Sequence, residues 1–286
     1  MPTEPGNGGS AESLSARVKT ALVGLLFIAL VIAVGWPLLV PFLAALVWFA
    51  AGELYAMFQN RGVRINLRAL RVGGVLFLLA SLPQLENVGH YTGVPWREIT
   101  LGLVLFFLLI YELFTARDVE RAVYTAFGFL YLPWTLGYAL LLRYAPDGNV
   151  GAWTLTLPVI ATFATDVGAF FVGTKWGRRK IAPDISPSKT LEGSIGGILA
   201  SFLALLVYTA LVHRAFPFGW VELLLVSFLI SLAAQLGDLT ESMLKRYTGV
   251  KDSGSLLPGH GGVLDRLDSL IFSLPVTYYL WELFGK

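Results

Sequence analysis

Long apolar segments alternate with short polar ones along nearly the whole chain. The apolar segments fall at about 18–35, 37–58, 68–84, 99–115, 122–143, 152–174, 194–213, 219–244 and 263–284. Each is close to the ~20 residues that a transmembrane helix needs, although the segment at 68–84 is the shortest. The pattern therefore predicts an all-α, polytopic integral membrane protein with about nine transmembrane helices.

Composition supports the same class of protein. Of the 286 residues, 56% are hydrophobic and 14% are charged, and the mean hydropathy is +0.68, outside the range of soluble globular domains. Residues 1–16 are polar and rich in Gly and Ser, so we expect a disordered tail there, without the apolar core of a signal peptide. About five spans are expected in 17–150 and about four in 151–286, where two loops carry the chemical motifs.

Lysine and arginine residues are distributed unevenly between the two ends of the predicted spans. If the N-terminus lies inside, 17 of the 21 fall in inner segments, and the outer four are Arg97, Arg143, Arg214 and Lys286. Cytoplasmic loops carry the excess of these residues in membrane proteins. The split predicts a multi-pass protein of the cell (inner) membrane with a cytoplasmic N-terminus, and it places the motif loops at 175–193 and 245–262 in the cytoplasm.

The stretch 237–268 carries a dense set of charges close to apolar segments. Read as a helix, its first part places a polar stripe at positions i, i+3, i+4 and i+7: Asp238, Glu241, Ser242 and Lys245. A glycine-rich loop at 258–262 then leads to Asp265 and Asp268, three residues apart at the start of the last segment. Unpaired charge at this depth is costly, so the stretch predicts a functional site able to hold a divalent metal and a polyphosphate.

A second group of polar residues occupies 166–193. Asp166 lies inside an apolar segment, where it contacts a cation or substrate or pairs with a basic residue of a neighbouring helix. The basic cluster of Lys175, Arg178, Arg179 and Lys180 is either a membrane anchor or an attractor of anionic lipids and nucleotides. Ser188 is expected to cap the following helix, with Glu192 in its first turns, so that Lys189 and the hydroxyl groups surround an anion-binding helix N-terminus.

Other polar residues give weaker signals. Glu53 and Glu112 are expected to be structural partners of Arg61, Arg117 or Arg121. The chain has no cysteine, which excludes thiolate catalysis and disulfides. Neither a nucleophile elbow nor a Walker A glycine loop is present in the sequence. Nothing predicts a nucleic-acid partner.

The C-terminal motifs also carry a family resemblance. The run Ser242-x-Leu244-Lys245-Arg246, Lys251-Asp252, Pro258-x-His260-Gly261-Gly262 and Asp265-Arg266-x-Asp268 resembles the signature of phosphatidate cytidylyltransferases (CDP-diacylglycerol synthases). The Ser186-Pro187-x-Lys189-Thr190-x-Glu192-Gly193 element resembles the same family, with Ser188 where a second lysine is frequent. The resemblance implies a membrane enzyme that joins CTP to phosphatidate, with release of pyrophosphate and with Mg2+ as cofactor.

The resemblance and the residue pattern together give a set of candidate site residues. Expected catalytic residues are Asp238, Asp265, Asp268, Lys245 and Lys251. Expected substrate-binding residues are Asp166, Lys175, Ser186, Lys189, Thr190, Glu192, Ser242, Arg246, Asp252, His260, Gly261, Gly262 and Arg266. Asp238 and Asp265 are the predicted Mg2+ ligands, because both end apolar segments on the inner side. Asp268 is expected to orient them or to hold a second cation such as K+.

Two other functions remain open at this point. CTP-dependent lipid-alcohol kinases, which phosphorylate polyprenols or phytol, resemble the chain in the Gly237-Asp238 and His260-Gly261-Gly262-x-x-Asp265-Arg266-x-Asp268 elements. An ion-coupled transporter is disfavoured, because the charges gather at one membrane face rather than at the midplane. Because closed dimers are the commonest homo-oligomers, a homodimer in the lipid bilayer is the expected assembly.

Overall fold

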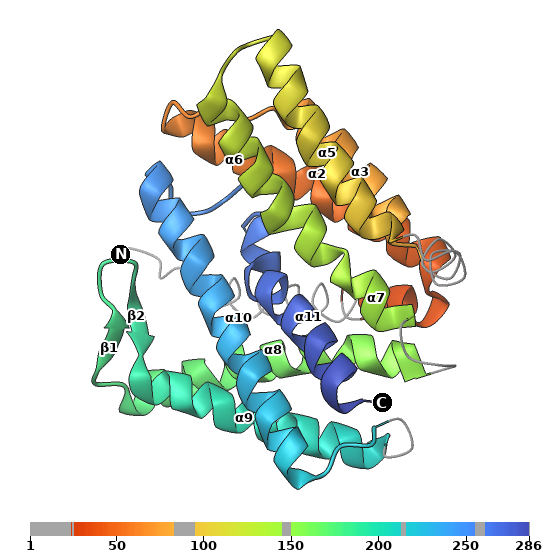
Figure 1. Ribbon diagram of the computed structural model, residues 1–286. Coiled ribbons are helices and arrows are strands. Elements are labelled where there is room, and N and C mark those ends of the chain that lie inside the picture. The colour runs from red at the N-terminus through yellow and green to blue at the C-terminus, as the bar shows by residue number, and fades with distance from the viewer. Residues whose placement is uncertain are drawn as a thin grey trace, which may run out of the picture.

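The computed structural model describes residue 24 and residues 26–82, 95–144, 150–212, 216–254 and 261–285. Residues 26–34 are helical. The elements that follow are α2 (Trp36–Asn60), α3 (Leu67–Ala80), α5 (Trp96–Phe114), α6 (Val119–Phe129), the π-helical turn η1 (Leu130–Trp134), α7 (Tyr138–Tyr144), α8 (Val150–Trp176), β1 (Lys180–Ala182), β2 (Ser186–Thr190), α9 (Leu191–Leu211), α10 (Trp220–Thr248) and α11 (Leu264–Phe284) (Figure 1). The predicted tail at 1–16 lies outside the described residues.

Five helices in the described part of the chain are long and apolar enough to cross a membrane. They are α2, the run Val119–Tyr144, α8, α9 and α10. The chain is thus a helical, polytopic membrane protein, as the apolar segments predict. The count of nine spans and the inside–outside orientation stay predictions. In the described part of the segment predicted at 68–84, the helix is the 14-residue α3, which is shorter than a full span.

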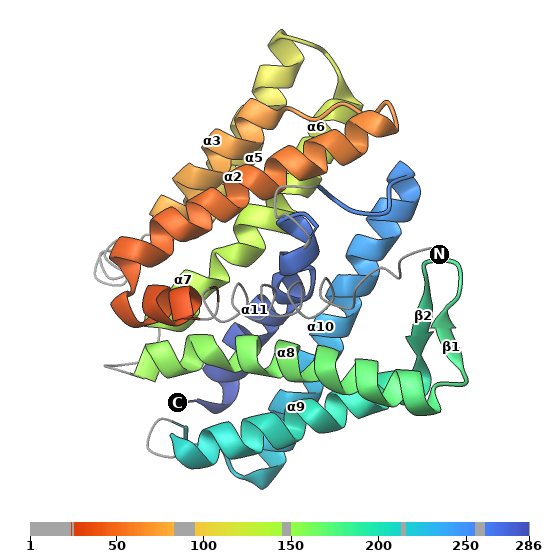
Figure 2. The ribbon, with the colours of Figure 1, turned by 180° about the vertical axis from the view of Figure 1, so that it is seen from behind.

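The helices form two groups joined by a central pair. Figures 1 and 2 show α2, α3, α5 and α6 together in the upper part of the molecule, with α8 and α9 side by side and antiparallel in the lower part. The helices α10 and α11 connect the groups, and α11 contributes Leu267 and Ile271 to the first apolar core and Leu280 and Trp281 to the second. The two apolar cores therefore share helix α11.

Small residues bring α8 and α9 close together. A methyl group on Gly168 would come within 2.4 Å of the Ala200 side chain, and one on Gly196 would come within 2.4 Å of Val172. Hydrocarbon solvent provides no hydrophobic force between helices, so close backbone packing of this kind supplies much of the attraction. The close packing of α8 and α9 fixes the two ends of the hairpin that connects them.

The connection between α8 and α9 is a two-stranded antiparallel hairpin, in which Lys180 pairs with Thr190 and Ala182 with Ser186. The fold class is all-α as predicted, and this short hairpin is an addition that the sequence did not predict. The cap predicted at Ser188 is wrong, because residues 186–190 are extended and pair with β1. Helix α9 begins after Thr190 instead. Thr190 is its cap, because Oγ1 of Thr190 accepts a hydrogen bond from the Gly193 amide at 3.2 Å.

Candidate active site

The helices α10 and α11 cross at the position where the carboxylates gather. A methyl group on Gly237 would lie 2.3 Å from the backbone oxygen of Asp268, so only glycine permits this approach. The next residue, Asp238, is thereby carried to the start of α11. The Gly237-Asp238 pair therefore has a structural reason: the glycine allows the contact that brings two aspartates from different helices together.

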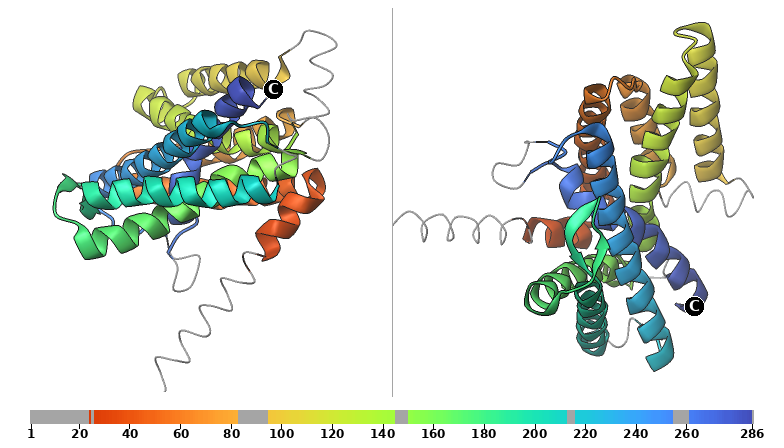
Figure 3. Two further views of the ribbon diagram at one scale, coloured as in Figure 1. Left: turned by 90° about the horizontal axis from the view of Figure 1, so that it is seen from below. Right: turned by 90° about the vertical axis from the view of Figure 1, so that its left-hand side faces the viewer.

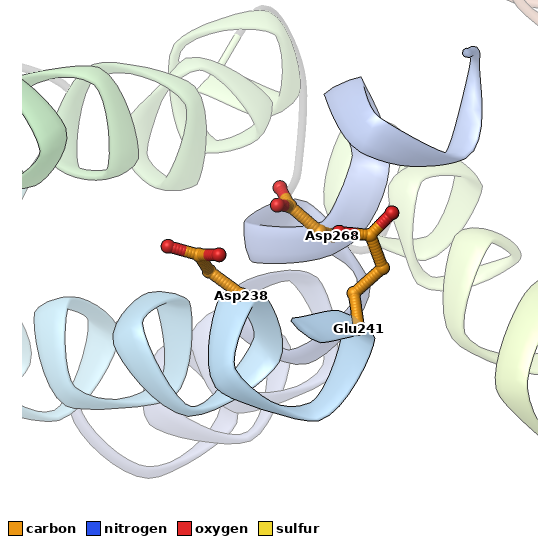
Figure 4. A group of neighbouring side chains, drawn as sticks. All are labelled: Asp238, Glu241 and Asp268. Carbon is orange, nitrogen blue, oxygen red and sulfur yellow. The ribbon is translucent and has the colours of Figure 1, made fainter. Parts of the chain in front are cut away.

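Three carboxylates meet at this crossing (Figure 4). Asp238 and Glu241 extend from α10 and Asp268 from α11, with one oxygen of each within 4.8 Å of the others. Asp238 and Glu241 share a face because they are three residues apart, as the polar stripe predicts. Glu241 is fully buried. Three negative groups this close repel one another unless a cation lies among or beside them.

Lys245 supplies one such positive charge. Its Nζ lies 2.6 Å from Oε2 of Glu241, one turn earlier on α10, and 2.8 Å from Oδ1 of Asp265. Leaving the buried Glu241 carboxylate without this partner would cost about 3–5 kcal/mol. Lys245 therefore ties α10 to the first turn of α11 and balances the charges of Glu241 and Asp265.

Asp265 has a different environment from the one predicted for it. Besides Lys245, its carboxylate accepts hydrogen bonds from the amides of Gly262 at 2.8 Å and Ser253 at 3.1 Å. The structure brings Asp268, rather than Asp265, into the carboxylate cluster with Asp238. The predicted Asp238–Asp265 metal pair stays a prediction, and the contacts of Asp265 with Ser253 and Gly262 indicate that it anchors the described ends of the loop before α11.

Glu53 reaches this loop from α2, far away in sequence. Its carboxylate accepts hydrogen bonds from the amides of Val263 at 2.9 Å and Leu264 at 2.8 Å, and from the Ser253 hydroxyl at 3.3 Å. These amides belong to the start of α11, where no residue of the helix itself accepts them. The structural role predicted for Glu53 is confirmed, but its partners are amides and a hydroxyl rather than a basic residue. Glu112, in contrast, pairs with Arg121 at 3.2 Å as expected.

The two described glycines of the loop are fixed by space and by backbone angle. Gly261 has φ +81°, in the left-handed region that side chains disfavour. A methyl group on Gly262 would lie 2.2 Å from the Ser253 hydroxyl and 2.6 Å from the Glu53 carboxylate. The glycines thus allow the backbone to approach its two carboxylate acceptors, Glu53 and Asp265.

The hairpin closes the other side of the cluster. Lys189 on β2 forms an ion pair with Asp238, and Asp166 on α8 interacts electrostatically with both residues. Arg246 Nε donates to the Ile185 backbone oxygen at 3.1 Å, which ties the hairpin to α10. The two sequence regions predicted to carry chemistry, 166–193 and 237–268, therefore meet around Asp238.

Thr190 and Glu192, in the 186–193 element, form hydrogen bonds that stabilise the local backbone. Thr190 is buried and caps α9, and Glu192 accepts hydrogen bonds from the amides of Arg178 at 2.9 Å and Arg179 at 3.1 Å. Both side chains are thus occupied within the turn. Their predicted substrate contacts stay predictions, and Lys189 is the member of this element that points to the carboxylates.

The other predicted residues lie on α8, the hairpin, α10, α11 and the segment that follows α10. Ser186 and Ser242 are half-buried, whereas Lys251, Asp252 and Arg266 are exposed. Lys175 is exposed at the end of α8, with its ammonium 4.7 Å from the Trp176 ring centre. His260 lies outside the described residues.

Three residues of this site are not among the candidate site residues. Glu241 is recognised in the polar stripe with Asp238 and Lys245 but is given no role in the site. Ser253, whose backbone and hydroxyl join Asp265 to Glu53, follows the Lys251-Asp252 motif but has no spacing that distinguishes it. Glu53 carries no local signal, because its partners lie 210 and 211 positions later.

The residues present fit a hard divalent cation. Carboxylate oxygens are the ligands that Mg2+ prefers, and it is usually held by one or two carboxylates together with water and substrate oxygens. Asp238 and Asp268 are half-buried and open enough for this, while Glu241 is already paired with Lys245. The charge balance of the cluster, with carboxylates in excess over the two lysines, favours a bound cation.

The fold and the site together define a polytopic helical membrane protein with a carboxylate–lysine centre where α10, α11 and the hairpin meet. Comparison with known proteins gives its family. Residues 15–284 match the model of the cytidylyltransferase family, so the chain belongs to that family.

Similar proteins cover almost the whole chain. The phosphatidate cytidylyltransferase of Bacillus subtilis is 31% identical over 279 residues, covering 95% of this chain and 99% of the relative. That of Thermotoga maritima is 32% identical over 287 residues, covering 95% and 97%. That of Synechocystis is 31% identical over 290 residues, covering 92% and 94%.

Proposed function

We propose that this chain is a CTP:phosphatidate cytidylyltransferase that forms CDP-diacylglycerol and pyrophosphate. The observation that carries the proposal is the meeting of Lys189, Lys245 and the carboxylates of Asp238 and Asp268 at one centre, in a chain whose full-length relatives bear this name. A phosphate oxygen of phosphatidate attacks the α-phosphorus of CTP, and the bond from that phosphorus to the β-phosphate oxygen breaks. Pyrophosphate leaves.

Both substrates are anions, so the residues must offset their repulsion. We propose that Lys189 moves from Asp238 to a substrate phosphate when the substrates bind, while Lys245 keeps Glu241 and Asp265 in place. The attacking phosphate is already ionised at neutral pH, which removes the need for a strong general base. Mg2+, held by Asp238 and Asp268, would supply charge neutralisation on the shared phosphates. The remaining contribution of the chain is to position the two phosphates.

The position of the label in CTP tests this function against the lipid-alcohol kinase. A purified cytidylyltransferase should transfer label from the α-phosphate of CTP into a lipid product, and only when phosphatidate is present. A kinase would instead transfer the γ-phosphate to a lipid alcohol. Label that enters lipid from the γ-phosphate, but not from the α-phosphate, would overturn the proposal.

Lys189→Ala is expected to weaken substrate use without unfolding the protein. The side chain is partly exposed, and among the described residues it pairs with Asp238, which has other charged groups nearby. Loss of one charge-assisted phosphate contact should lower kcat/KM by roughly 10- to 100-fold. Steady-state kinetics for both substrates check this, with the exposed Lys180→Ala as the matched hairpin control. Equal kinetics for the two variants would exclude a phosphate contact at Lys189.

The cytoplasmic orientation of the site is part of the same proposal and rests on the uneven charge distribution. Single cysteines can be placed at Ser188 and Trp220, both exposed, because the native chain has none. On intact cells, an impermeant thiol reagent should label position 220 and should reach position 188 only after permeabilisation. Labelling of position 188 alone on intact cells would reverse the topology.

A further inference from the structure

A cavity of about 780 Å³ lies between α3 and α5, away from the carboxylate cluster. Its volume falls within the ~300–1,000 Å³ of typical ligand pockets. The lining is largely apolar and includes Leu76 of α3, Leu103 and Phe107 of α5, and Phe129 of α6. We refer to this cavity as the α3–α5 groove.

The groove is open because α5 is a peripheral helix. In the right-hand view of Figure 3, α5 stands at the outer edge of the molecule. Its apolar side chains are well exposed, with Leu103 at 62% and Phe107 at 65%, and Leu76 on α3 is 51% exposed. In a membrane, hydrocarbon covers such surfaces, so an elongated apolar groove of this kind suits an acyl chain.

Most polar lining residues lie at one end of the groove. Asn66 and Arg68 stand at the start of α3, Tyr111 lies near the end of the antiparallel α5, and Thr125 lies on α6. The opposite end is formed mainly by Leu79 and Ala80, with Thr100. The helix α3 is about 20 Å long, more than half of the ~30 Å hydrocarbon core, so the groove follows the depth over which an acyl chain extends.

Charge at the polar end favours an anion. The carboxylate there, Glu112, is already paired with Arg121 at 3.2 Å and accepts a hydrogen bond from the Asn66 side-chain amide at 3.0 Å. Arg68 is exposed, and within the described part of the chain it forms no ion pair or hydrogen bond. Arg64, four residues earlier in the segment that precedes α3, is exposed as well. A guanidinium at the mouth of an apolar groove matches a phosphate attached to an acyl chain.

We infer that the α3–α5 groove binds an anionic phospholipid, with one acyl chain along Leu76, Leu103 and Phe107 and with the lipid phosphate beside Arg68. This site is distinct from the carboxylate–lysine centre, which lies on α10 and α11. The ligand class is a lipid with net negative charge, whether a phosphodiester such as phosphatidylglycerol or the phosphomonoester phosphatidate.

Fluorescence quenching by brominated lipids tests the inference directly. The full chain, free of cysteine, takes a single reporter at Leu103→Cys, labelled with a small thiol-reactive fluorophore and reconstituted in nanodiscs. Brominated phosphatidylglycerol should quench it at about a fivefold lower mole fraction than brominated phosphatidylcholine, as expected for one basic residue at a lipid surface. A reporter at Leu203→Cys, on the lipid-exposed face of α9, should show no preference.

Charge variants identify the residue responsible. Arg68→Gln in the Leu103→Cys background should abolish the preference for the anionic lipid, and Arg68→Lys should retain part of it. Lys180→Gln, which removes an exposed charge from β1, should leave it unchanged. Brominated phosphatidate in a parallel series distinguishes the two lipid sources: equal quenching by phosphatidate and phosphatidylglycerol assigns the site to anionic lipids in general, and stronger quenching by phosphatidate assigns it to the phosphomonoester.

Three results would overturn the inference. Equal quenching by brominated phosphatidylcholine and the anionic lipids would show ordinary lipid contact, and an anionic preference that persists in Arg68→Gln would place the phosphate elsewhere. Protection of the Leu103→Cys reporter from all brominated lipids would show that protein, such as a second copy of the chain, fills the groove. None of these readouts depends on enzyme activity, so the result is independent of the proposed function.

Discussion

Asp238→Asn should lose at least about 2–4 kcal/mol of transition-state stabilisation, or roughly 30- to 1,000-fold in kcat/KM, and should need more Mg2+. The substitution keeps the shape of the side chain and one carbonyl oxygen but removes a negative charge from the cluster shown in Figure 4. Asp268→Asn should behave alike, because its carboxylate comes from the facing helix. The double variant should be little worse than either single one, since ligands of one metal act as a unit.

Initial rates with CTP and phosphatidate, measured across a range of Mg2+ concentrations on well-folded, detergent-purified protein, check this expectation. Asp184→Asn is the matched control, because Asp184 is an exposed carboxylate in the turn of the hairpin. Near-native activity and an unshifted Mg2+ requirement in both Asp238→Asn and Asp268→Asn would refute the metal assignment.

Asp265→Asn separates the metal site from the loop that supports it. Asp265 holds Lys245 and the amides of Gly262 and Ser253, so its substitution should lower activity through the loop. On the observed contacts, its Mg2+ requirement should shift less than that of Asp238→Asn. An equal shift would favour the Asp238–Asp265 pair predicted from sequence.

Glu53→Ala should also lower kcat/KM strongly, by roughly 100-fold or more. The substitution removes the acceptor of two amide hydrogen bonds and one hydroxyl hydrogen bond at the start of α11, and bonds to a charged group contribute about 1.5–3 kcal/mol each. Glu53→Gln should recover part of the activity, because its carbonyl oxygen still accepts. Hydrogen exchange at the amides of Val263 and Leu264 provides a direct readout and should quicken in Glu53→Ala.

Glu112→Ala is the matched control for this prediction. Glu112 is buried in the same half of the chain and, among the described residues, pairs with Arg121 and Asn66 rather than with the loop before α11. Its loss should lower the melting temperature yet leave exchange at Val263 and Leu264 unchanged. If Glu53→Ala resembles Glu112→Ala in both activity and exchange, Glu53 is only a general structural residue.

Local regularities of the sequence predicted much of this arrangement. Apolar segments of about 20 residues located the helices, because a span in hydrocarbon must satisfy its own backbone. Helical spacing placed Asp238 and Lys245 on one face, and the structure joins them through Glu241. The pairing of Glu112 with Arg121 followed from proximity across one short turn.

The features that sequence reasoning missed depend on tertiary contacts. The extended state of residues 186–190 results from pairing with β1, which overrides the capping preference of Ser188. The choice of Asp268 over Asp265 as the neighbour of Asp238 depends on how closely α10 and α11 approach at Gly237. No local pattern reports the angle at which two helices cross.

The contact between Glu53 and α11 also sets an order for biosynthesis. Glu53 is made 210 residues before Val263, a delay of about 10–40 s at ~5–20 residues per second. During that interval α2 holds a carboxylate close to the membrane without its final hydrogen-bond donors, a state that is costly in hydrocarbon. The nascent chain therefore carries an incomplete site until its last helix arrives. A ribosome that stalls before α11 would leave a chain whose earlier helices have inserted but whose Glu53 carboxylate lacks these amide donors.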